Sequence, residues 1–203
     1  MRVMRAYMVS RLAAFRADER ATMTVEFCIS FPLLMVWFLG SFVFWDGFRS
    51  RSHSAKAAYT VSDILSRYSS VSDANLDELY SLQQKMLPRS HNSTALRMTS
   101  ICFREGADPF SNTDDEYFVV WSEGRGIAQP MKQSEIPFAI IPAMSDGDSI
   151  VLTESWAPWR PLVDWVGISD MVWESHLVTR PRFVELIAHK DVSSSNLCPS
   201  AST

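Results

Sequence analysis

The feature that most constrains this chain is a run from Phe27 to Trp45 in which no residue is charged. At ~1.5 Å per helical residue, such a run spans most of a ~30 Å hydrocarbon core. A single carboxylate, Glu26, stands immediately before the run. The sequence therefore predicts a transmembrane helix over 22–48 with an ionisable group at its boundary.

Glu26 has two interpretations. An ionisable group inside a membrane segment costs on the order of 2.5 to 3.5 kcal/mol at the centre and less near the edge. A chain that keeps such a group uses it, unless Glu26 is simply the last solvated residue before the span. Position alone leaves both interpretations open.

Composition limits what the rest of the chain can be. Its 203 residues allow one membrane helix and one modest domain, because soluble domains cluster near roughly 100 to 150 residues. A net charge of -4 argues against a nucleic-acid partner. An aromatic content of 12% predicts that the part after the helix folds.

The first 21 residues form a leader with five arginines against one aspartate and one glutamate. By the positive-inside rule, this leader is cytoplasmic and the domain after the helix lies outside the membrane. Arg49, Arg51 and Lys56 partly balance the count on the far side. A secretory signal peptide is the competing interpretation, with Ala55-Lys56-Ala57 as its small-x-small cleavage pattern.

Within the apolar run, Pro32 removes the amide that would bond to the Cys28 carbonyl, which predicts a kink or a loosened turn. Small and polar residues on one side of a membrane helix let another helix approach closely. One face of the run gathers the carboxylate, a hydroxyl and two glycines, and its residues are Glu26, Ser30, Leu33, Trp37, Gly40, Phe44 and Gly47. The alternative is that glycine occurs on this face by chance.

After Asp46 the helical pattern continues as an amphipathic extension over 49–87. SerSerValSer at 69–72 interrupts it, Asp73 can cap a new helical segment, and Pro88 ends that segment. The remaining residues divide into an α+β domain over 88–188 and a mobile tail over 189–203, where serine, asparagine, proline and threonine predominate.

Short β-branched or aromatic runs that begin at Met98, Tyr117 and Ser149 predict an antiparallel sheet of at least three strands. The apolar segment 136–143 has proline near both ends, so we expect a packed connecting segment rather than a central strand. Two proline-containing pieces, 156–161 and 179–183, should be extended. The predicted fold class is α+β.

The cysteines differ in location. Cys28 lies within the apolar run, whereas Cys102 and Cys198 lie far downstream. If the domain is exported, the latter two are candidates for a disulfide; two unpaired thiols are the alternative.

No catalytic or metal-binding motif is present, so the sequence predicts no enzyme activity, no metal and no cofactor. Glu174-Ser175-His176 suggests nucleophile chemistry, but sequence neighbours rarely form such a site. The acidic residues between Asp108 and Glu116 lack the ligand spacing of a calcium loop. Asn92-Ser93-Thr94 fits a glycosylation pattern and is interpreted as chance.

The arginine-rich leader, the glutamate at the head of an apolar helix, the amphipathic extension and the small sheet together resemble type IV pilins and pseudopilins. More narrowly, ArgAlaThrMetThrValGluPhe at 20–27 followed by Pro32 resembles the head of the TadE and TadF minor pseudopilins of the tight-adherence (Flp) pilus. ThrArgProArgPhe at 179–183 and GlyAspSerIleValLeuThrGluSerTrp at 147–156 resemble the distal part of TadE-like proteins. The resemblance reaches most of the chain, and its head is moderately specific.

The resemblance implies a bacterial inner-membrane protein, single-pass, with a periplasmic domain. Its partners would be a prepilin peptidase, other pilus subunits and the inner-membrane assembly machinery. The peptidase would cut between Ala21 and Thr22, which leaves Glu26 fifth in the mature chain. The family usually has glycine where this chain has Ala21.

The spacing explains why assembly would need the glutamate. The new amine of Thr22 and the carboxylate of Glu26 lie one helical turn apart on one face. In low dielectric the two charges gain from pairing and are costly when unpaired, so Glu26 can neutralise the amine of a neighbouring subunit. A membrane-anchored periplasmic sensor or ligand-binding domain is the alternative function; it needs neither the cut nor Glu26.

Overall fold

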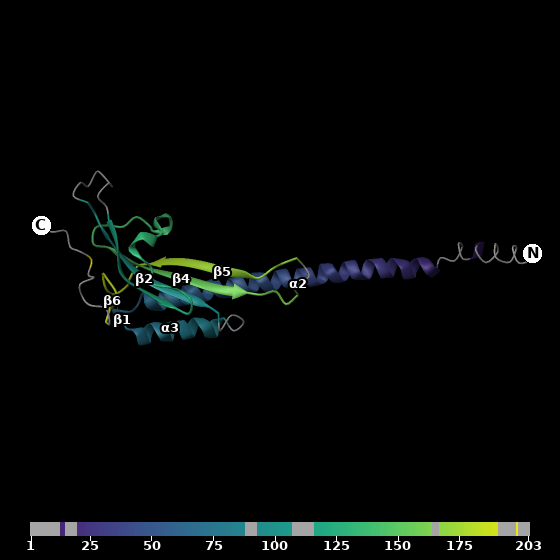
Figure 1. Ribbon diagram of the computed structural model, residues 1–203, viewed down its shortest axis with the longest axis horizontal. Coiled ribbons are helices and arrows are strands. Elements are labelled where there is room, and N and C mark those ends of the chain that lie inside the picture. The colour runs from purple at the N-terminus through teal and green to yellow at the C-terminus, as the bar shows by residue number, and fades with distance from the viewer. Residues whose placement is uncertain are drawn as a thin grey trace, which may run out of the picture. The chain divides into compact units, whose positions relative to one another are not determined.

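The computed structural model describes residues 13–14, 20–87, 93–106, 116–163, 167–190 and 198. The chain divides into two compact units. One comprises Met1–Asp46 and Leu162–Ile168, and the other comprises Gly47–Pro161 and Ser169–Thr203. The fold is α+β, as predicted, with a long N-terminal helix and a four-stranded antiparallel sheet (Figure 1).

Helix α2 runs from Arg20 to Leu65 without a break and continues through Pro32. It is long and apolar enough to cross a membrane, judged by length and composition. The helix thus continues from the apolar run into the amphipathic extension without a boundary, as the sequence predicted after Asp46. The predicted amphipathic face is confirmed, because Ala57, Val61 and Leu65 are fully buried.

Helix α3 spans Asp73–Met86 and buries Leu76 and Leu79. Its N-cap is Ser72, one residue before the predicted cap, and the Ser72 amide donates to Asn75 Oδ1 at 3.1 Å. The correction follows from geometry, because a serine in extended backbone can exchange bonds with the side chain at the third helical position.

The sheet has the order β3-β2-β4-β5 and every neighbouring pair is antiparallel. Its three predicted strands are confirmed. The fourth, β5, was not predicted as a strand. The bounds are β2 Ala95–Arg104, β3 Glu116–Arg125, β4 Ser149–Trp159 and β5 Met171–Thr179.

A parallel pair of two-residue strands joins β1, Ser70–Val71, to β6, Ala188–His189. His189 pairs with Val71 and is buried. The predicted tail therefore does not begin at residue 189, because a backbone ladder holds that residue to the segment between the helices.

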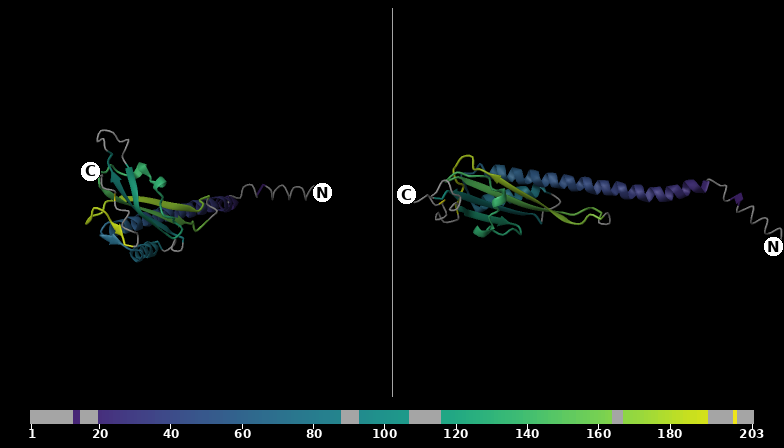
Figure 2. Two further views of the ribbon diagram at one scale, coloured as in Figure 1. Left: turned by 60° about the vertical axis from the view of Figure 1, so that its left-hand side comes forward. Right: turned by 90° about the horizontal axis from the view of Figure 1, so that it is seen from above.

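The two faces of the sheet bury different partners (Figure 2). On one face, β2 and β4 contribute Leu96, Met98 and Val151 to a cluster that includes residues of α2 and α3. On the other, Ile101 and Leu152 pack with residues of the segment between β3 and β4. That segment holds the short 3-10 turns η1, Gln133–Glu135, and η2, Phe138–Ile140. The expected connecting segment over 136–143 is thus confirmed.

The outer edge of β3 is closed by the side chain of Gln133. The Val119 amide donates to Gln133 Oε1 at 2.9 Å, and Gln133 Nε2 donates to the Tyr117 carbonyl. One amide group thereby makes both bonds that a further strand would offer at this point.

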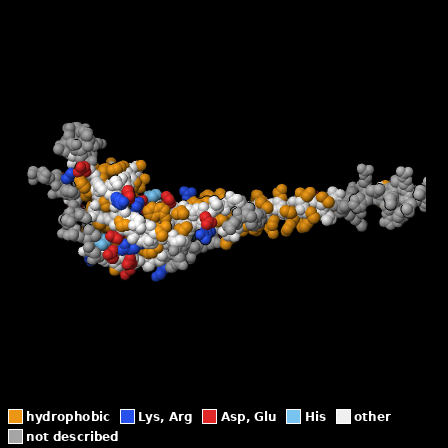
Figure 3. Space-filling view, viewed as in Figure 1, with side chains coloured by type: hydrophobic (Ala, Val, Ile, Leu, Met, Phe, Trp, Pro, Cys, Tyr) orange, Lys and Arg blue, Asp and Glu red, His pale blue; other side chains and the backbone are white. Residues whose placement is uncertain are grey.

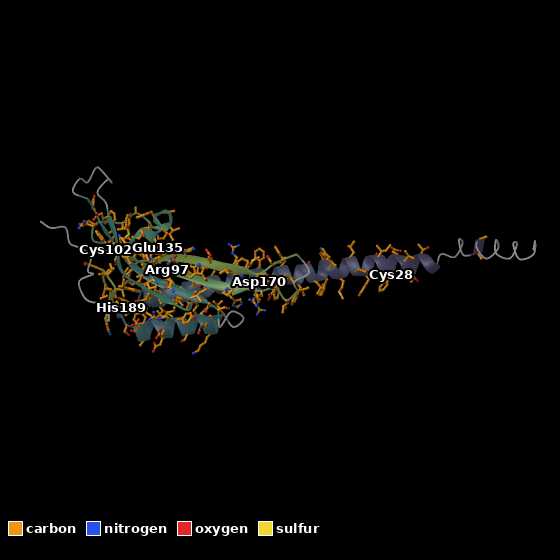
Figure 4. The ribbon with its side chains drawn as sticks, in the orientation of Figure 1. Cys28, Arg97, Cys102, Glu135, Asp170 and His189 are labelled. Atoms are coloured by element: carbon orange, nitrogen blue, oxygen red, sulfur yellow. A yellow bond between two sulfur atoms is a disulfide. The ribbon has the colours of Figure 1, made fainter. Side chains whose placement is uncertain are left out.

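A disulfide joins Cys102 on β2 to Cys198, across a sequence separation of 96 (Figure 4). The pairing is the one the sequence suggested for an exported domain. Cys102 is fully buried, whereas the free thiol of Cys28 is exposed on α2.

We predict that Cys198→Ser lowers the free energy of unfolding of the sheet domain by about 2 to 4 kcal/mol, because a long loop is no longer closed in the unfolded state. Urea titration of the detergent-solubilised chain, followed by tryptophan fluorescence, measures this. Cys28→Ser is the matched control and should change stability by less than about 0.5 kcal/mol. Equal effects of the two variants would contradict the structural role of the bond.

Candidate functional site

The start of α2 presents Thr22 and Glu26 as exposed side chains. They are separated by one helical turn and therefore lie on one face. Within the described chain, the carboxylate of Glu26 precedes the uncharged run directly. This is the arrangement that the sequence predicted for the pair.

The bond between Ala21 and Thr22 lies in α2, which is described from Arg20 onward.

The apolar part of α2 is covered by little of its own chain. Only 6% of its most apolar window is buried, and Leu33 and Trp37 are 67% and 70% exposed. Figure 3 shows hydrophobic side chains along this part of the helix. Contiguous apolar surface of this kind marks contact with a membrane or another protein.

The small residues of the predicted packing face differ in their surroundings. Ser30 is exposed and Gly40 is partly exposed. Gly47 is buried, and a Cβ placed on it would lie 3.5 Å from the indole of Trp159. Trp159 of the same chain therefore lies against Gly47, and the packing of another helix at the predicted face stays a prediction.

A second group of functional-looking residues centres on Arg125, at the end of β3. Its guanidinium donates to Asp73 at 2.7 Å, to Asp77 at 2.6 Å and to Glu123 at 2.9 Å. Burial alone would lower the pKa of Arg125, but hydrogen bonds with these three carboxylates and the charge of Asp77 together raise it above its ordinary value. The arginine stays charged and fastens α3 to the sheet.

Asp73, Glu123 and His189 place one potential metal-ligand atom each within 4.8 Å of one another. Arg125 already bonds to both carboxylates of this group, so a cation would have to displace a guanidinium. We therefore interpret the cluster as an ion-pair network (Figure 4 labels His189). Sequence reasoning missed it, although the i, i+4 spacing of Asp73 and Asp77 signals two carboxylates on one helix face.

A third cluster crosses the sheet. Glu154 on β4 is buried, accepts a hydrogen bond from Arg97 Nε at 2.5 Å and lies 3.2 Å from His176 Nδ1. Arg97 also stacks over Trp156, with 5.4 Å from its guanidinium carbon to the ring centre. Ser175 points to the opposite face from His176 because adjacent strand residues alternate, so the two do not form a nucleophile and base pair.

Two remaining sequence suggestions lie partly outside the described residues. The acidic segment between Asp108 and Glu116 is described only at Glu116, which pairs with Arg104. In Asn92-Ser93-Thr94 the asparagine itself is not described.

The alternative signal-peptide cleavage pattern, Ala55-Lys56-Ala57, lies inside α2. Ala57 belongs to the core, so a cut there would divide the folded domain.

Comparisons with protein-family models, with curated proteins and with solved structures gave no match for this chain.

We predict that Arg125→Met lowers the free energy of unfolding by about 1 to 3 kcal/mol, because three carboxylates lose a charged donor. Arg67→Met is the matched control; its partner Asp63 is one turn away on the helix surface, where such pairs contribute about 0.3 to 0.5 kcal/mol. Urea denaturation measures both. A smaller loss for Arg125→Met than for the control would refute the fastening role.

Proposed function

We propose that this protein is a TadE-like minor pseudopilin that takes part in assembly of a tight-adherence pilus. In this proposal α2 spans the bacterial inner membrane once, with the N-terminus cytoplasmic and the sheet domain periplasmic. The leader is removed by a prepilin peptidase, and the mature helix associates with other pilus subunits.

The observation that carries the proposal is the exposed Glu26 directly before a largely exposed run of α2 that has no charged residue. A carboxylate in this position is costly in lipid unless it is paired or neutralised. A simple membrane anchor would have no need of it. Assembly supplies a reason, because each processed neighbour brings a new ammonium group.

The pairing requires a stagger between neighbouring helices. Thr22 and Glu26 are separated by about 6 Å along the axis, since each helical residue advances ~1.5 Å. A neighbour shifted by about that distance places its Thr22 amine beside Glu26. The attraction is strong at low dielectric, so the pair favours one axial register over others.

We expect the mature protein to begin at Thr22. N-terminal sequencing and intact-mass analysis of the membrane-extracted chain measure this directly. Ala21→Gly restores the residue usual in the family and should increase the processed fraction, whereas Ala21→Lys should reduce it by placing a bulky cation at the cut. A functional protein that keeps its whole leader would refute processing and favour the anchored-domain alternative.

Glu26→Gln should reduce incorporation into the sheared pilus fraction at least tenfold, because the neighbour's amine then lacks its counter-charge. Membrane levels of the variant should stay unchanged, which separates assembly from folding. Glu78→Gln is the control, since Glu78 is an exposed carboxylate on α3. Normal incorporation of Glu26→Gln, measured by immunoblot of both fractions, would exclude the pairing.

A further inference from the structure

The loop between β4 and β5 offers apolar side chains to its surroundings. Leu162 is 61% exposed, and Val163 and Ile168 are partly exposed. On the adjoining strand Val172 is 50% exposed. Surface loops are ordinarily rich in polar and turn-forming residues, so aliphatic side chains at a hairpin tip need an explanation.

We propose that this tip, Leu162, Val163 and Ile168, is a second membrane contact that enters the interfacial layer of the lipid bilayer beside α2. The proposal rests on the proposed function in one respect, the membrane span of α2. It adds a lipid-binding surface in the part of the chain that follows the span.

The chain's own contacts bring the hairpin to the end of the apolar run. Trp159, the last residue of β4, packs on Gly47, and Gly47 is two residues beyond Trp45 in the same helix. At the start of β5, Trp173 lies under Arg51, with 5.9 Å between the guanidinium carbon and the ring centre. Both strands therefore contact α2 within two turns of Trp45, the last residue of the uncharged run.

The loop also groups with the apolar half of the helix. Leu162–Ile168 belong to the same compact unit as Met1–Asp46, whereas the strands on either side belong to the other unit. In this unit Val43 is fully buried although its neighbours Phe42 and Phe44 are exposed. Val43 is therefore a covered side chain in the last turn of the uncharged run.

Charged side chains next to the tip limit how deeply the tip can enter the bilayer. Arg160 and Asp170 form a 2.9 Å ion pair at the base of the loop, and both side chains are mostly exposed (Figure 4 labels Asp170). An exposed ion pair needs water or headgroups, so the base cannot enter the hydrocarbon. Tryptophan and arginine are the residues that favour the interface between lipid and water.

Lipid is favoured over a protein partner for this surface because it continues the surface of the span. The uncharged run of α2 ends next to the residues that the hairpin strands contact, and Leu162, Val163 and Ile168 supply aliphatic side chains. An interfacial element of this kind needs only an apolar side and charged flanks. It would also limit how far the domain can tilt from the bilayer.

Depth-dependent quenching tests the contact in the full chain. With Cys28→Ser as background and the disulfide kept oxidised, Leu162→Cys and, separately, Ile168→Cys are labelled with an NBD fluorophore. The chain is reconstituted in phosphatidylcholine–phosphatidylglycerol vesicles with nitroxides at the headgroup, at an upper acyl position or near the bilayer centre. We expect both labels to be quenched most by the headgroup and upper-acyl nitroxides.

Two further labelled sites serve as controls for the quenching at residues 162 and 168. Ile127→Cys, at a side chain that is 81% exposed beyond β3, should be quenched by none of the lipids. Trp37→Cys should be quenched most by the deepest nitroxide. Quenching at residue 37 with none at 162 and 168 would overturn the tip contact alone. No quenching at residue 37 would reject the span and the tip together.

Labels at 162 and 168 that are shielded from every lipid nitroxide, with blue-shifted emission that depends on protein concentration, would place another chain on the tip and overturn the lipid assignment.

Discussion

An apolar helix surface that its own chain does not cover must be covered by something else. In the first half of α2 most large hydrophobic side chains are exposed, and such surface is unfavourable in water in proportion to its area. Lipid can cover it, and so can other helices. The position of Glu26 is unusual for this reason, because the same carboxylate would be ordinary on a helix that faces water.

One continuous helix meets two different environments. Before Asp46 most of its described side chains are exposed, and after Gly47 it buries Ala57, Val61 and Leu65 in the sheet domain. No loop separates the two parts within α2. The hydrogen-bonded helix is therefore continuous from the apolar run into the part that packs in the sheet domain.

Sequence reasoning succeeded where a local pattern decides the structure. The uncharged run, the amphipathic helical extension after Asp46 and the strands near Met98, Tyr117 and Ser149 can all be recognised from short-range periodicity. Strand β5 was not predicted because its residues are mostly exposed or half-exposed on both faces, so buried and exposed positions alternate only weakly along it. Its place in the sheet comes from pairing with β4.

Contacts between distant segments were the other failure. The sequence around Gly47 does not indicate that Trp159 packs against it. The sequence around Glu154 likewise does not indicate its contacts with Arg97 and His176. These pairings depend on the register of β2, β4 and β5. The position of Thr22 and Glu26 on one helix face could be predicted because the two residues are neighbours in one helix, whereas the grouping of the hairpin tip with the first half of α2 required the tertiary structure.

The glutamine that caps strand β3 has a consequence for how copies of this chain can meet. An unpaired strand edge can recruit the edge of another molecule and begin aggregation. Gln133 satisfies the main-chain groups of Tyr117 and Val119 from within the molecule. Crowded copies are thereby discouraged from joining their sheets along this border, which leaves association to surfaces elsewhere on the chain.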